Sequence, residues 1–402
     1  MTDFTHLTAC LACGHDGLIK YWDGGSHPPA NSFYKDGDPE PAAYPLGLQY
    51  CPVCWHSQNL VVVDPKLLYE NYAYASGTSQ TLRDYFADFV TQVEIEFGFK
   101  KLRVLDIACN DGSLLKEFKK RGHKVQGIDP AANLNDGSVP ILNTFWNEAA
   151  IRMLPTNGGV TPYDVVIAMN VLGHVADPLG FLLAAKHVLA PGGRIYVQTS
   201  QATMAEDGMI DTCYHEHLSF FTAESFGALA TRADLQITGI RHEPIHGVSY
   251  VVTMITVADG WKTVGDFAIR RDERFKGYYS PTLYNAFAPR VALHVDHVKR
   301  TLALLEREGY VLAGYGASAK AITFNNFAGI HLALIVDDGP LKQGKKCPGT
   351  GTPVVKNIPT EGRIAWVLGT WTMAPEIITK IKKARPGADD KFLTYYPTVT
   401  IE

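Results

Sequence analysis

Apolar and polar residues follow the order strand, helix, strand along two stretches of the chain. In the first stretch, short apolar runs at residues 103–107 and 125–129 flank an amphipathic segment at 113–120. In the second, similar runs at 310–315 and 334–337 flank a glycine turn and the start of another helix. Buried strands joined through a helix are typical of βαβ units. We therefore predict an α/β fold with a central and a C-terminal Rossmann-like region.

Two longer amphipathic helices are also predicted. Residues 80–97 carry apolar side chains at helical spacing, namely Leu82, Phe86, Phe89, Val90 and Val93. Residues 291–308 show the same periodicity, and Gly309 is expected to end that helix. Residues 261–292 are polar and are interrupted by glycine and proline. A loop with three tyrosines, among them Tyr72, precedes the first helix, and it is either half-buried packing or an active-site lid.

Length and composition narrow the class of protein. A chain of 402 residues is long for one hydrophobic core, so two or three domains are expected. The net charge of -4 argues against a nucleic-acid-binding surface built on bulk positive charge. No apolar run approaches the roughly 20 residues that span a bilayer, and residues 1–6 do not resemble a signal peptide. We therefore expect a cytoplasmic protein without nucleic-acid or membrane partners.

Four of the seven cysteines form two Cys-x-x-Cys pairs near the N-terminus. Cys10 and Cys13 form the first pair, and Cys51 and Cys54 form the second. In a reducing compartment such pairs hold metal more often than they form disulfides. Four thiolates arranged tetrahedrally suit Zn²⁺ and leave no open coordination position. The sequence thus predicts a structural zinc site that helps a loop-rich segment to fold.

The first βαβ unit carries the residues expected at a cofactor site. Its first strand leads into Asp-x-Ala-x-Asn-Asp-Gly, which begins at Asp106, and its second strand ends at a carboxylate that suits ribose hydroxyl groups. The motif resembles motif I of the S-adenosylmethionine-dependent methyltransferases, whose usual Asp-x-Gly-x-Gly is relaxed here at two places. The expected cofactor-binding residues are Asp106, Ala108, Asn110, Asp111, Gly112, Asp129 and, in the loop after a later strand, Asn170.

The segment Tyr214-His215-Glu216-His217 places four titratable side chains at consecutive positions. An unperturbed imidazole titrates near pH 6.5, so a histidine here suits a general base at neutral pH. Two other interpretations remain open, a polar loop with satisfied histidines and a metal site that uses the His-x-His pair. His174, in the loop after the strand at 163–169, is expected to pack near the cofactor.

Together these segments resemble one family, the three-domain sugar C-methyltransferases, which act on nucleotide-linked 4-keto-deoxysugars. The resemblance rests on the cysteine pairs, motif I and residues 211–219, and it extends to residues 28–33, 314–320 and 337–344. It covers nearly the whole chain. It implies a zinc-binding domain at 1–70, an S-adenosylmethionine-dependent methyltransferase domain at 71–262 and a Rossmann-like domain at 263–402 for nucleotide-sugar recognition.

The resemblance also implies roles for single residues. It assigns the catalytic base to His217, and it places Tyr214, Glu216 and Tyr72 beside that base. Substrate contacts are expected from His246 and Ser249, and contacts with a diphosphate from Gly316, Lys320 and Lys342. Two alternatives stay open: His246 as a strand-end residue, and the glycine turn as scaffold or dimer surface. The family commonly has His-Gly-Gly-Ser where this chain has Val248 at the third position, and a valine there is expected to change the shape of the sugar accepted.

The leading hypothesis is therefore methyl transfer from S-adenosylmethionine to a carbon atom of a nucleotide-linked 4-keto-deoxysugar. A ketone acidifies the adjacent C–H, so a positioned base can form an enolate whose carbon attacks the methyl group. Two alternatives stay open. One is O- or N-methylation of a related sugar or small molecule, and the other is a non-catalytic protein that binds a nucleotide sugar or the cofactor.

Overall fold

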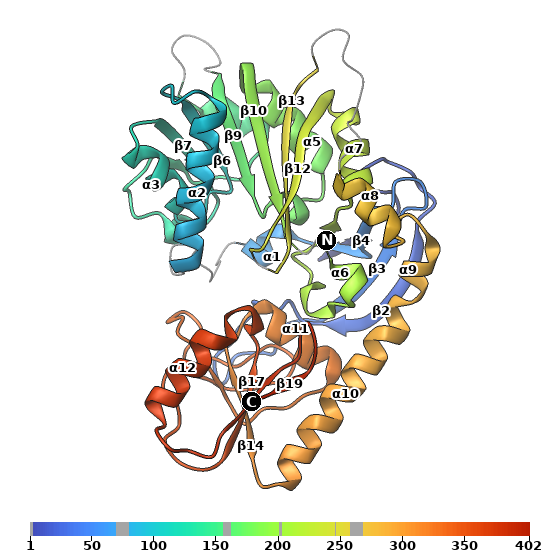
Figure 1. Ribbon diagram of the computed structural model, residues 1–402, viewed down its shortest axis with the longest axis vertical. Coiled ribbons are helices and arrows are strands. Elements are labelled where there is room, and N and C mark those ends of the chain that lie inside the picture. Colours follow the sequence, from blue (N-terminus) through green and yellow to red (C-terminus); the bar gives the residue numbers. More distant parts are fainter. Residues whose placement is uncertain (1–2, 70–79, 156–161, 201–202, 246, 258–267) are drawn as a thin grey trace.

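The computed structural model describes residues 3–69, 80–155, 162–200, 203–245, 247–257 and 268–402. Within these residues the chain forms an N-terminal, a central and a C-terminal region, the last two built on mostly parallel sheets (Figure 1). The predicted α/β fold, with a zinc-binding segment and two Rossmann-like regions, is confirmed. Among the helices of the described residues, none has the length and apolar character needed to cross a membrane.

Short antiparallel strands build the N-terminal region. One sheet contains β2 (Ile19–His27), β3 (Tyr44–Tyr50), β4 (Ser57–Asn59) and, from the central part of the chain, β11 (Ser219–Phe220). A second pairing joins β1 (Phe4–His6) to β5 (Val61–Val63), and α1 (Pro65–Tyr69) follows. Because β11 pairs with β4, the chain directly after residue 217 is hydrogen-bonded to the zinc-binding segment.

The central region contains a sheet with the strand order β12-β13-β10-β9-β6-β7-β8. The chain runs from β6 outward to β7 and β8 and then crosses to β9 on the other side, so the order reverses between β6 and β9. In open α/β sheets, ligands bind at the carboxyl ends of the strands at such a reversal. The strands are β6 (Arg103–Ile107), β7 (Lys124–Ile128), β8 (Ile141–Leu142), β9 (Tyr163–Met169), β10 (Leu189–Thr199), β12 (Leu235–Glu243) and β13 (Ser249–Thr256).

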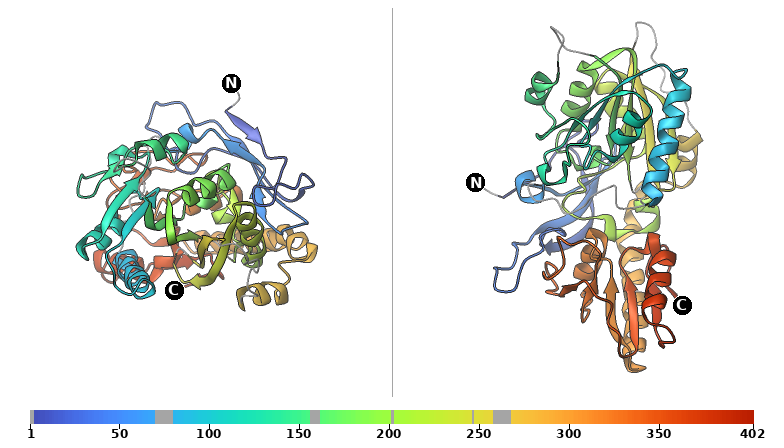
Figure 2. Two further views of the ribbon diagram at one scale, coloured as in Figure 1. Left: turned by 90° about the horizontal axis from the view of Figure 1, so that it is seen from above. Right: turned by 90° about the vertical axis from the view of Figure 1, so that its left-hand side faces the viewer.

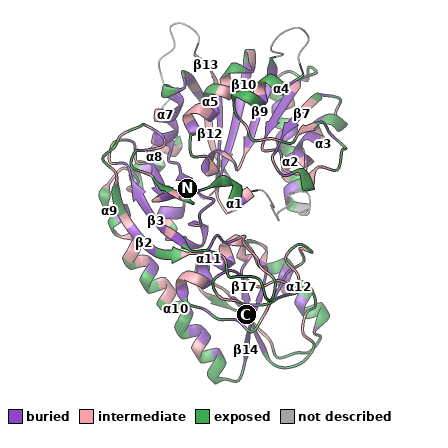
Figure 3. Ribbon diagram, turned by 180° about the vertical axis from the view of Figure 1, so that it is seen from behind, coloured by how far each residue is buried: buried purple, intermediate pink, exposed green. Residues whose placement is uncertain are grey.

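Helices cover both faces of this sheet, and the sheet itself is buried (Figure 3). On β9, Val166 and Ala168 pack with helices α5 and α7, whereas Val165 and Ile167 pack with α2 and α3. Alternate residues of a strand point to opposite faces, which explains why this strand is apolar throughout. The helices are α2 (Gln80–Glu96), α3 (Ser113–Lys120), α4 (Glu148–Met153), α5 (Pro178–His187) and α7 (Ala223–Arg232).

The C-terminal region repeats this plan with the strand order β16-β15-β14-β17-β18-β19. Helices α10 (Phe287–Arg307) and α11 (Ala319–Ala328) pack on one face, and α12 (Ala374–Ala384) packs on the other. The strands are β14 (Val311–Tyr315), β15 (Ile335–Val336), β16 (Val354–Val355), β17 (Ile364–Leu368), β18 (Lys391–Thr394) and β19 (Thr400–Ile401).

Two short helices, α8 (Ala268–Phe275) and α9 (Pro281–Asn285), precede α10 within the segment expected to be irregular. Helix α10 begins at Phe287 instead of residue 291, because Pro289 lies in its first turn, where a missing N–H costs nothing. The buried Glu273 of α8 accepts hydrogen bonds of 3.0 Å from the backbone N–H of Ala223 at the start of α7. This contact fixes α8 to the central region.

The carboxyl ends of the two parallel sheets face each other, and residues 204–218 lie between them (Figure 1). On one side, Leu218 N donates to Gly173 O, in the loop after β9, at 2.8 Å. On the other, Trp371 Nε1, in the loop after β17, donates to Asp211 Oδ2 at 2.9 Å. The N-terminal region also reaches the C-terminal one, through a bridge between Tyr34 and Lys346 (Figure 2). The Tyr214–His217 segment is therefore enclosed by all three regions.

Candidate active site

The four paired cysteines come together in the folded chain. All four Sγ atoms lie within 4.8 Å of one another, and Cys10 to Cys54 and Cys13 to Cys51 are each 3.5 Å apart. Both pairs form the same tight turn, since Gly14 N donates to Cys10 O and Trp55 N donates to Cys51 O at 2.9 Å. Four thiolates at this spacing fit tetrahedral Zn²⁺ and fill its coordination sphere, so the zinc site is structural.

The zinc site is attached to the central region. Arg232, at the end of α7, donates from Nη1 to Ala12 O at 2.8 Å, directly within the first cysteine turn. The buried His56 contacts Ser219 Oγ at 3.1 Å through Nε2. Metal binding therefore organises the surface on which β11 pairs, because β4 and the second cysteine turn are adjacent in sequence.

The turn after β6 keeps a glycine-like backbone without the expected glycines. Ala108, Asn110 and Gly112 all have left-handed φ values, of 58°, 53° and 71°. Asparagine tolerates this conformation, whereas an alanine there costs about 1–2 kcal/mol. A Cβ atom at Gly112 would lie 2.5 Å from Val139 Cγ2, so only glycine fits. The relaxed motif thus preserves the shape of the turn, and the strain at Ala108 is offset by packing elsewhere.

Two carboxylates meet at this turn. Asp129, at the end of β7, accepts from Asn110 N and from Ala131 N, both at 2.8 Å. Burial raises the pKa of Asp129, and these two hydrogen bonds lower it in part. Burial, together with the nearby charge of Asp129, raises the pKa of Asp106 well above its usual range. A ligand that donates hydrogen bonds would relieve this unfavourable pair.

Three buried polar atoms at the carboxyl ends of adjacent strands have no hydrogen-bond partner among the described residues. They are Asp106 Oδ1 on β6, Asn170 Oδ1 after β9 and Thr199 Oγ1 at the end of β10. Buried polar atoms are nearly always hydrogen-bonded, so an unsatisfied row of them indicates a ligand site. The row lies at the reversal of strand order, where an α/β sheet binds its ligand. These residues fit a ligand that both donates and accepts hydrogen bonds, such as S-adenosylmethionine.

Tyr214, His217 and the backbone of Thr212 form a hydrogen-bonded chain. His217 Nδ1 lies 2.7 Å from Thr212 O, and Nε2 lies 2.7 Å from Tyr214 Oη. A carbonyl oxygen only accepts, so Nδ1 carries the proton and Nε2 of the neutral ring carries the lone pair. The backbone turn is closed by His217 N, which donates to Tyr214 O at 2.9 Å. The ring of His217 is thus held with its basic nitrogen toward Tyr214.

His174 and Glu216 complete the cluster around His217. The rings of His174 and His217 meet edge to face with centroids 4.8 Å apart, and Tyr69 Oη lies 3.3 Å from His174 Nδ1. Burial lowers the pKa of His174 to about 4, which keeps it neutral at neutral pH. Glu216 Oε1 accepts from Asn31 Nδ2 at 2.9 Å, while burial raises the pKa of the Glu216 carboxyl group.

The two histidines of the His-x-His pair point to different partners. His215 Nε2 donates to Tyr44 O of β3 at 3.2 Å, and burial lowers the pKa of His215 to about 4. Among the described residues, the four cysteines are the one group of His, Cys, Asp and Glu side chains spaced for a metal ion. His215 therefore supports the zinc-binding sheet, and His217 faces the cluster.

The predicted substrate residues are more dispersed. Ser249 is buried and donates to Ile245 O at 2.8 Å within its own hairpin. Gly316, with φ of 88°, and Lys342, which donates to Ala317 O at 2.8 Å, meet at the start of α11. The Lys320 ammonium group is buried 5.2 Å from the centre of the Trp371 ring. Tyr72 and His246 lie outside the described residues.

The turn that holds Gly316 repeats the turn of the cofactor site. Asp337 directly follows β15 and accepts hydrogen bonds from two backbone N–H groups, those of Ala317 and Gly339, both at 2.7 Å. Asp129 after β7 likewise accepts from two backbone N–H groups. The two units differ in charge. Lys342 Nζ lies 3.5 Å from Asp337 Oδ2, whereas the described hydrogen bonds of Asp129 come from neutral backbone groups. The turn at Gly316 thus has a cation beside its carboxylate, which the turn at Asp129 lacks among its described hydrogen bonds.

Three contacts of the cluster were not predicted as site features. Asn31 lies in the segment 28–33, so its motif was available as a signal, although nothing in it pointed to Glu216. His174 was expected to pack near the cofactor, and its ring contact with His217 was not predicted. The contact of Trp371 with Asp211 had no local signal.

Comparison with known proteins divides the chain in the same order. Residues 10–69 match a family described as a putative zinc binding domain, and residues 76–239 match a methyltransferase domain. Residues 244–397 match a C-methyltransferase C-terminal domain. The C-methyltransferase NovU of Streptomyces niveus is 26% identical over 391 residues, which cover 94% of this chain and 93% of that protein.

Other similarities are confined to part of the chain. A ubiquinone biosynthesis O-methyltransferase of Dinoroseobacter shibae is 33% identical over 130 residues, covering 28% of this chain and 50% of that protein. Among solved structures, an S-adenosylmethionine-dependent methyltransferase from Clostridium acetobutylicum aligns with a TM-score of 0.36 and 11% identity, covering 44% of this chain and 92% of that one. The glycopeptide N-methyltransferase MtfA aligns with a TM-score of 0.34 and 12% identity, covering 46% and 93%.

Proposed function

Because this chain belongs to the three-domain, zinc-containing C-methyltransferases that depend on S-adenosylmethionine, we propose that its acceptor is a nucleotide-linked 4-keto-deoxysugar. The similarity to a C-methyltransferase over nearly the whole of both chains supports a carbon acceptor. Methylation of carbon requires a carbanion, and a ketone beside the reacting carbon stabilises one as an enolate. The acceptor therefore needs a carbonyl group, and the enzyme needs a base.

The single observation that carries the proposal is the hydrogen-bonded chain from Thr212 O through His217 to Tyr214. Because Nδ1 donates to Thr212, Nε2 is the atom that takes the proton from the acceptor carbon. Tyr214 Oη, 2.7 Å from Nε2, is placed to turn its O–H to the enolate oxygen once Nε2 is engaged. His174, neutral because burial lowers its pKa to about 4, adds no positive charge beside the ring of His217.

The cofactor side of the reaction uses the carboxyl end of the central sheet. S-adenosylmethionine, when bound, supplies an electrophilic methyl group. Asp129 would hold the ribose, and Asp106, Asn170 and Thr199 offer the unsatisfied polar atoms that line the same edge. Asp111 Oδ1 accepts from Ser113 N at 3.1 Å and fixes the start of α3. The residues of this edge orient the donor toward residues 204–218.

The acceptor side uses the opposing edge of the C-terminal sheet. Lys342 beside Asp337, the positive φ of Gly316 and the first turn of α11 form a surface for an anionic diphosphate. Phe33 of the N-terminal region lies under the Lys342 ammonium group, with the ring centre 5.7 Å away. A nucleotide anchored there would present its sugar to His217, with the methyl donor on the far side.

Incubation of the purified protein with S-adenosylmethionine and candidate nucleotide-linked ketosugars tests this function. Mass spectrometry detects the added methyl group, and NMR of the product distinguishes a methyl group on carbon from a methoxy or N-methyl group. We expect a C-methylated sugar. A methoxy or N-methyl product would replace the proposal by O- or N-methylation, and binding without methylation of any ketosugar would favour a non-catalytic role.

A further inference from the structure

The carbonyl group that orients His217 belongs to a short turn that is also held by contacts from the C-terminal region. Thr212 O lies in a 3₁₀ turn, Ile210–Thr212, and all three of its residues are buried. The turn packs against α11. Its position therefore depends on a part of the chain that follows it by more than 100 residues, as the partners below show.

The hydroxyl group of Tyr396 is hydrogen-bonded to the backbone at the start of this turn and just before it. Tyr396 Oη donates to Gly208 O at 2.8 Å and accepts from Ile210 N at 3.2 Å. Both partners are backbone groups, so the tyrosine fixes the path of the chain and not the rotamer of one side chain. Tyr396 is itself buried and stacks on His294 of α10, with ring centroids 4.6 Å apart.

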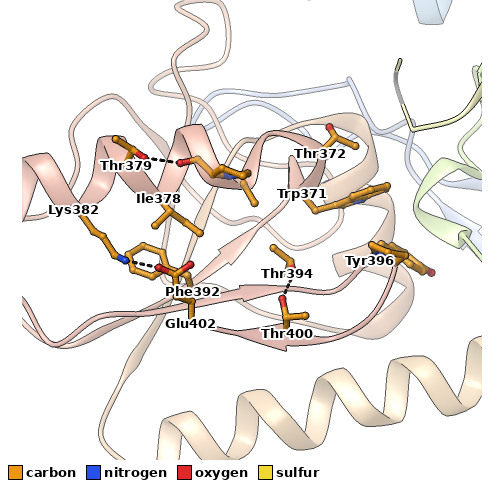
Figure 4. A pocket seen from close by; sticks show the side chains of 13 residues that line it. Trp371, Thr372, Ile378, Thr379, Lys382, Phe392, Thr394, Tyr396, Thr400 and Glu402 are labelled. Carbon is orange, nitrogen blue, oxygen red and sulfur yellow. Dashed lines mark hydrogen bonds and ion pairs between the residues drawn. The ribbon is translucent and has the colours of Figure 1, made fainter. Parts of the chain in front are cut away.

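Trp371 holds the second half of the turn. Its Nε1 donates to Asp211 Oδ2 at 2.9 Å. Asp211 directly precedes Thr212, whose carbonyl oxygen accepts the hydrogen bond from His217 Nδ1. The ring of Trp371 also covers the Lys320 ammonium group at 5.2 Å. Figure 4 shows Trp371 and Tyr396 at one end of a pocket of about 650 Å³ between α12 and strands β18 and β19. Their rings, with centroids 6.1 Å apart, line the pocket, and their polar atoms bond to residues 208–211.

We propose that Trp371 and Tyr396 are positioning residues for the catalytic base, which they align through the turn at residues 208–212; this inference rests on the proposed role of His217. The C-terminal region then does more than hold the acceptor. It fixes Thr212 O, and Thr212 O fixes the proton on His217 Nδ1. The lone pair then stays on Nε2, beside Tyr214 Oη, where the proposed proton transfer needs it. A displacement of about 1 Å in such a group lowers turnover by up to about 10²-fold.

Two substitutions and a matched control separate positioning from general packing. Trp371→Phe removes the indole N–H and keeps an aromatic ring, and Tyr396→Phe removes one hydroxyl group. Tyr395→Phe removes a hydroxyl group at the adjacent, equally buried position, where Oη donates to Gly369 O at 3.4 Å and not to residues 208–212. Thermal unfolding of the three variants shows whether each remains folded.

The first measurement needs no substrate. In full-length protein with ¹⁵N-labelled histidine, the signals of His217 are assigned by their loss in His217→Gln, and their shifts report which ring nitrogen carries the proton. We expect the proton on Nδ1 in the wild type and in Tyr395→Phe. We expect a mixture of the two tautomers in Trp371→Phe and Tyr396→Phe.

The second measurement is steady-state methylation of the ketosugar. We expect kcat to fall by about 10-fold to 100-fold in Trp371→Phe and Tyr396→Phe, with the acceptor KM changed by less than about threefold. Folded variants that match Tyr395→Phe in both tautomer and kcat would overturn the proposal. Failure of the wild type to make a C-methylated sugar would instead overturn the proposed function, and the tautomer measurement would still decide whether the two residues align His217.

Discussion

Asn31 of the zinc-binding region donates a hydrogen bond of 2.9 Å from Nδ2 to Oε1 of Glu216, next to His217 in the chain. Glu216 is fully buried, its other oxygen has no partner among the described residues, and burial raises its pKa. The N-terminal region thus contributes directly to the environment of the proposed base.

Replacement of Asn31 by alanine should lower kcat by about 10-fold, because it leaves Glu216 Oε1 buried without its donor. The affinity for S-adenosylmethionine, measured by calorimetry, should not change, since the hydrogen bond of Asn31 goes to Glu216 and not to the turn after β6. Ser32→Ala is the matched control, because Ser32 Oγ donates to Pro29 O at 2.6 Å in the same loop. Equal kcat values for Asn31→Ala and Ser32→Ala would show that the hydrogen bond from Asn31 to Glu216 does not affect turnover.

Zinc removal should unfold the N-terminal region and abolish methylation. Metal analysis should find about one zinc per chain, and a Cys51→Ser variant should lose the metal and melt at a lower temperature. Cys347→Ser, at a buried cysteine outside the cluster, should keep its zinc. A metal-free protein with the melting temperature and activity of the wild type would refute a structural role for the metal.

Asp129 after β7 and Asp337 after β15 occupy equivalent positions in the two Rossmann-like regions, and their substitution should affect different ligands. Asp129→Asn should weaken S-adenosylmethionine binding by about 10-fold to 100-fold, because a charged acceptor for the ribose is lost. Asp337→Asn removes the same group from the second unit and should leave cofactor affinity unchanged while raising the KM for the acceptor. Calorimetry with the cofactor alone makes the comparison, and equal losses in both variants would contradict the assignment of the two units.

Local features of the site could be predicted from the sequence, because neighbours in sequence form them. Examples are the turn that follows Asp106, the carboxylate after β7 and the segment Tyr214–His217. Each is formed by residues of one strand, helix or loop and its direct neighbour in the sequence. The left-handed backbone at Ala108 was not predictable from the residue type, since alanine disfavours it.

Contacts between regions could not be predicted in the same way. Asn31 and Glu216 are 185 residues apart, and Trp371 and Asp211 are 160 residues apart, so no periodicity joins them. The short helix α8 was missed for a related reason. Its one buried residue is the charged Glu273 and not an apolar stripe. Glu273 accepts from the backbone of Ala223 at a distant helix N-terminus and from the hydroxyl groups of Tyr250 and Tyr279.

Acid should destabilise the protein through its buried histidines. The pKa of His174 and that of His215 are each lowered to about 4, whereas an unfolded histidine titrates near 6.5. Between these pH values the unfolded chain binds more protons than the folded one. The free energy of unfolding therefore has its full value above about pH 6.5 and falls as the pH drops toward 4, by about 3 kcal/mol for each group. Melting temperatures across this range measure the loss.

The His215→Gln variant isolates one of these two contributions. Glutamine can still donate to Tyr44 O, but it does not titrate, so the variant should lose less stability than the wild type between pH 6.5 and 4. Both proteins keep the four cysteines, so any release of zinc in acid affects them equally. Parallel curves for the two proteins would show that His215 is not buried as a neutral ring.

Proton exchange at the acceptor carbon tests the central claim most directly. A nucleotide-linked 4-ketosugar is incubated in D₂O with the wild type or His217→Ala, each saturated with S-adenosylhomocysteine so that no methyl group is transferred, and ¹H NMR follows the C–H beside the ketone. The account predicts exchange with the wild type and a rate lower by about 10²-fold or more with His217→Ala, since general-base catalysis contributes that much. Exchange at the wild-type rate in His217→Ala would contradict it.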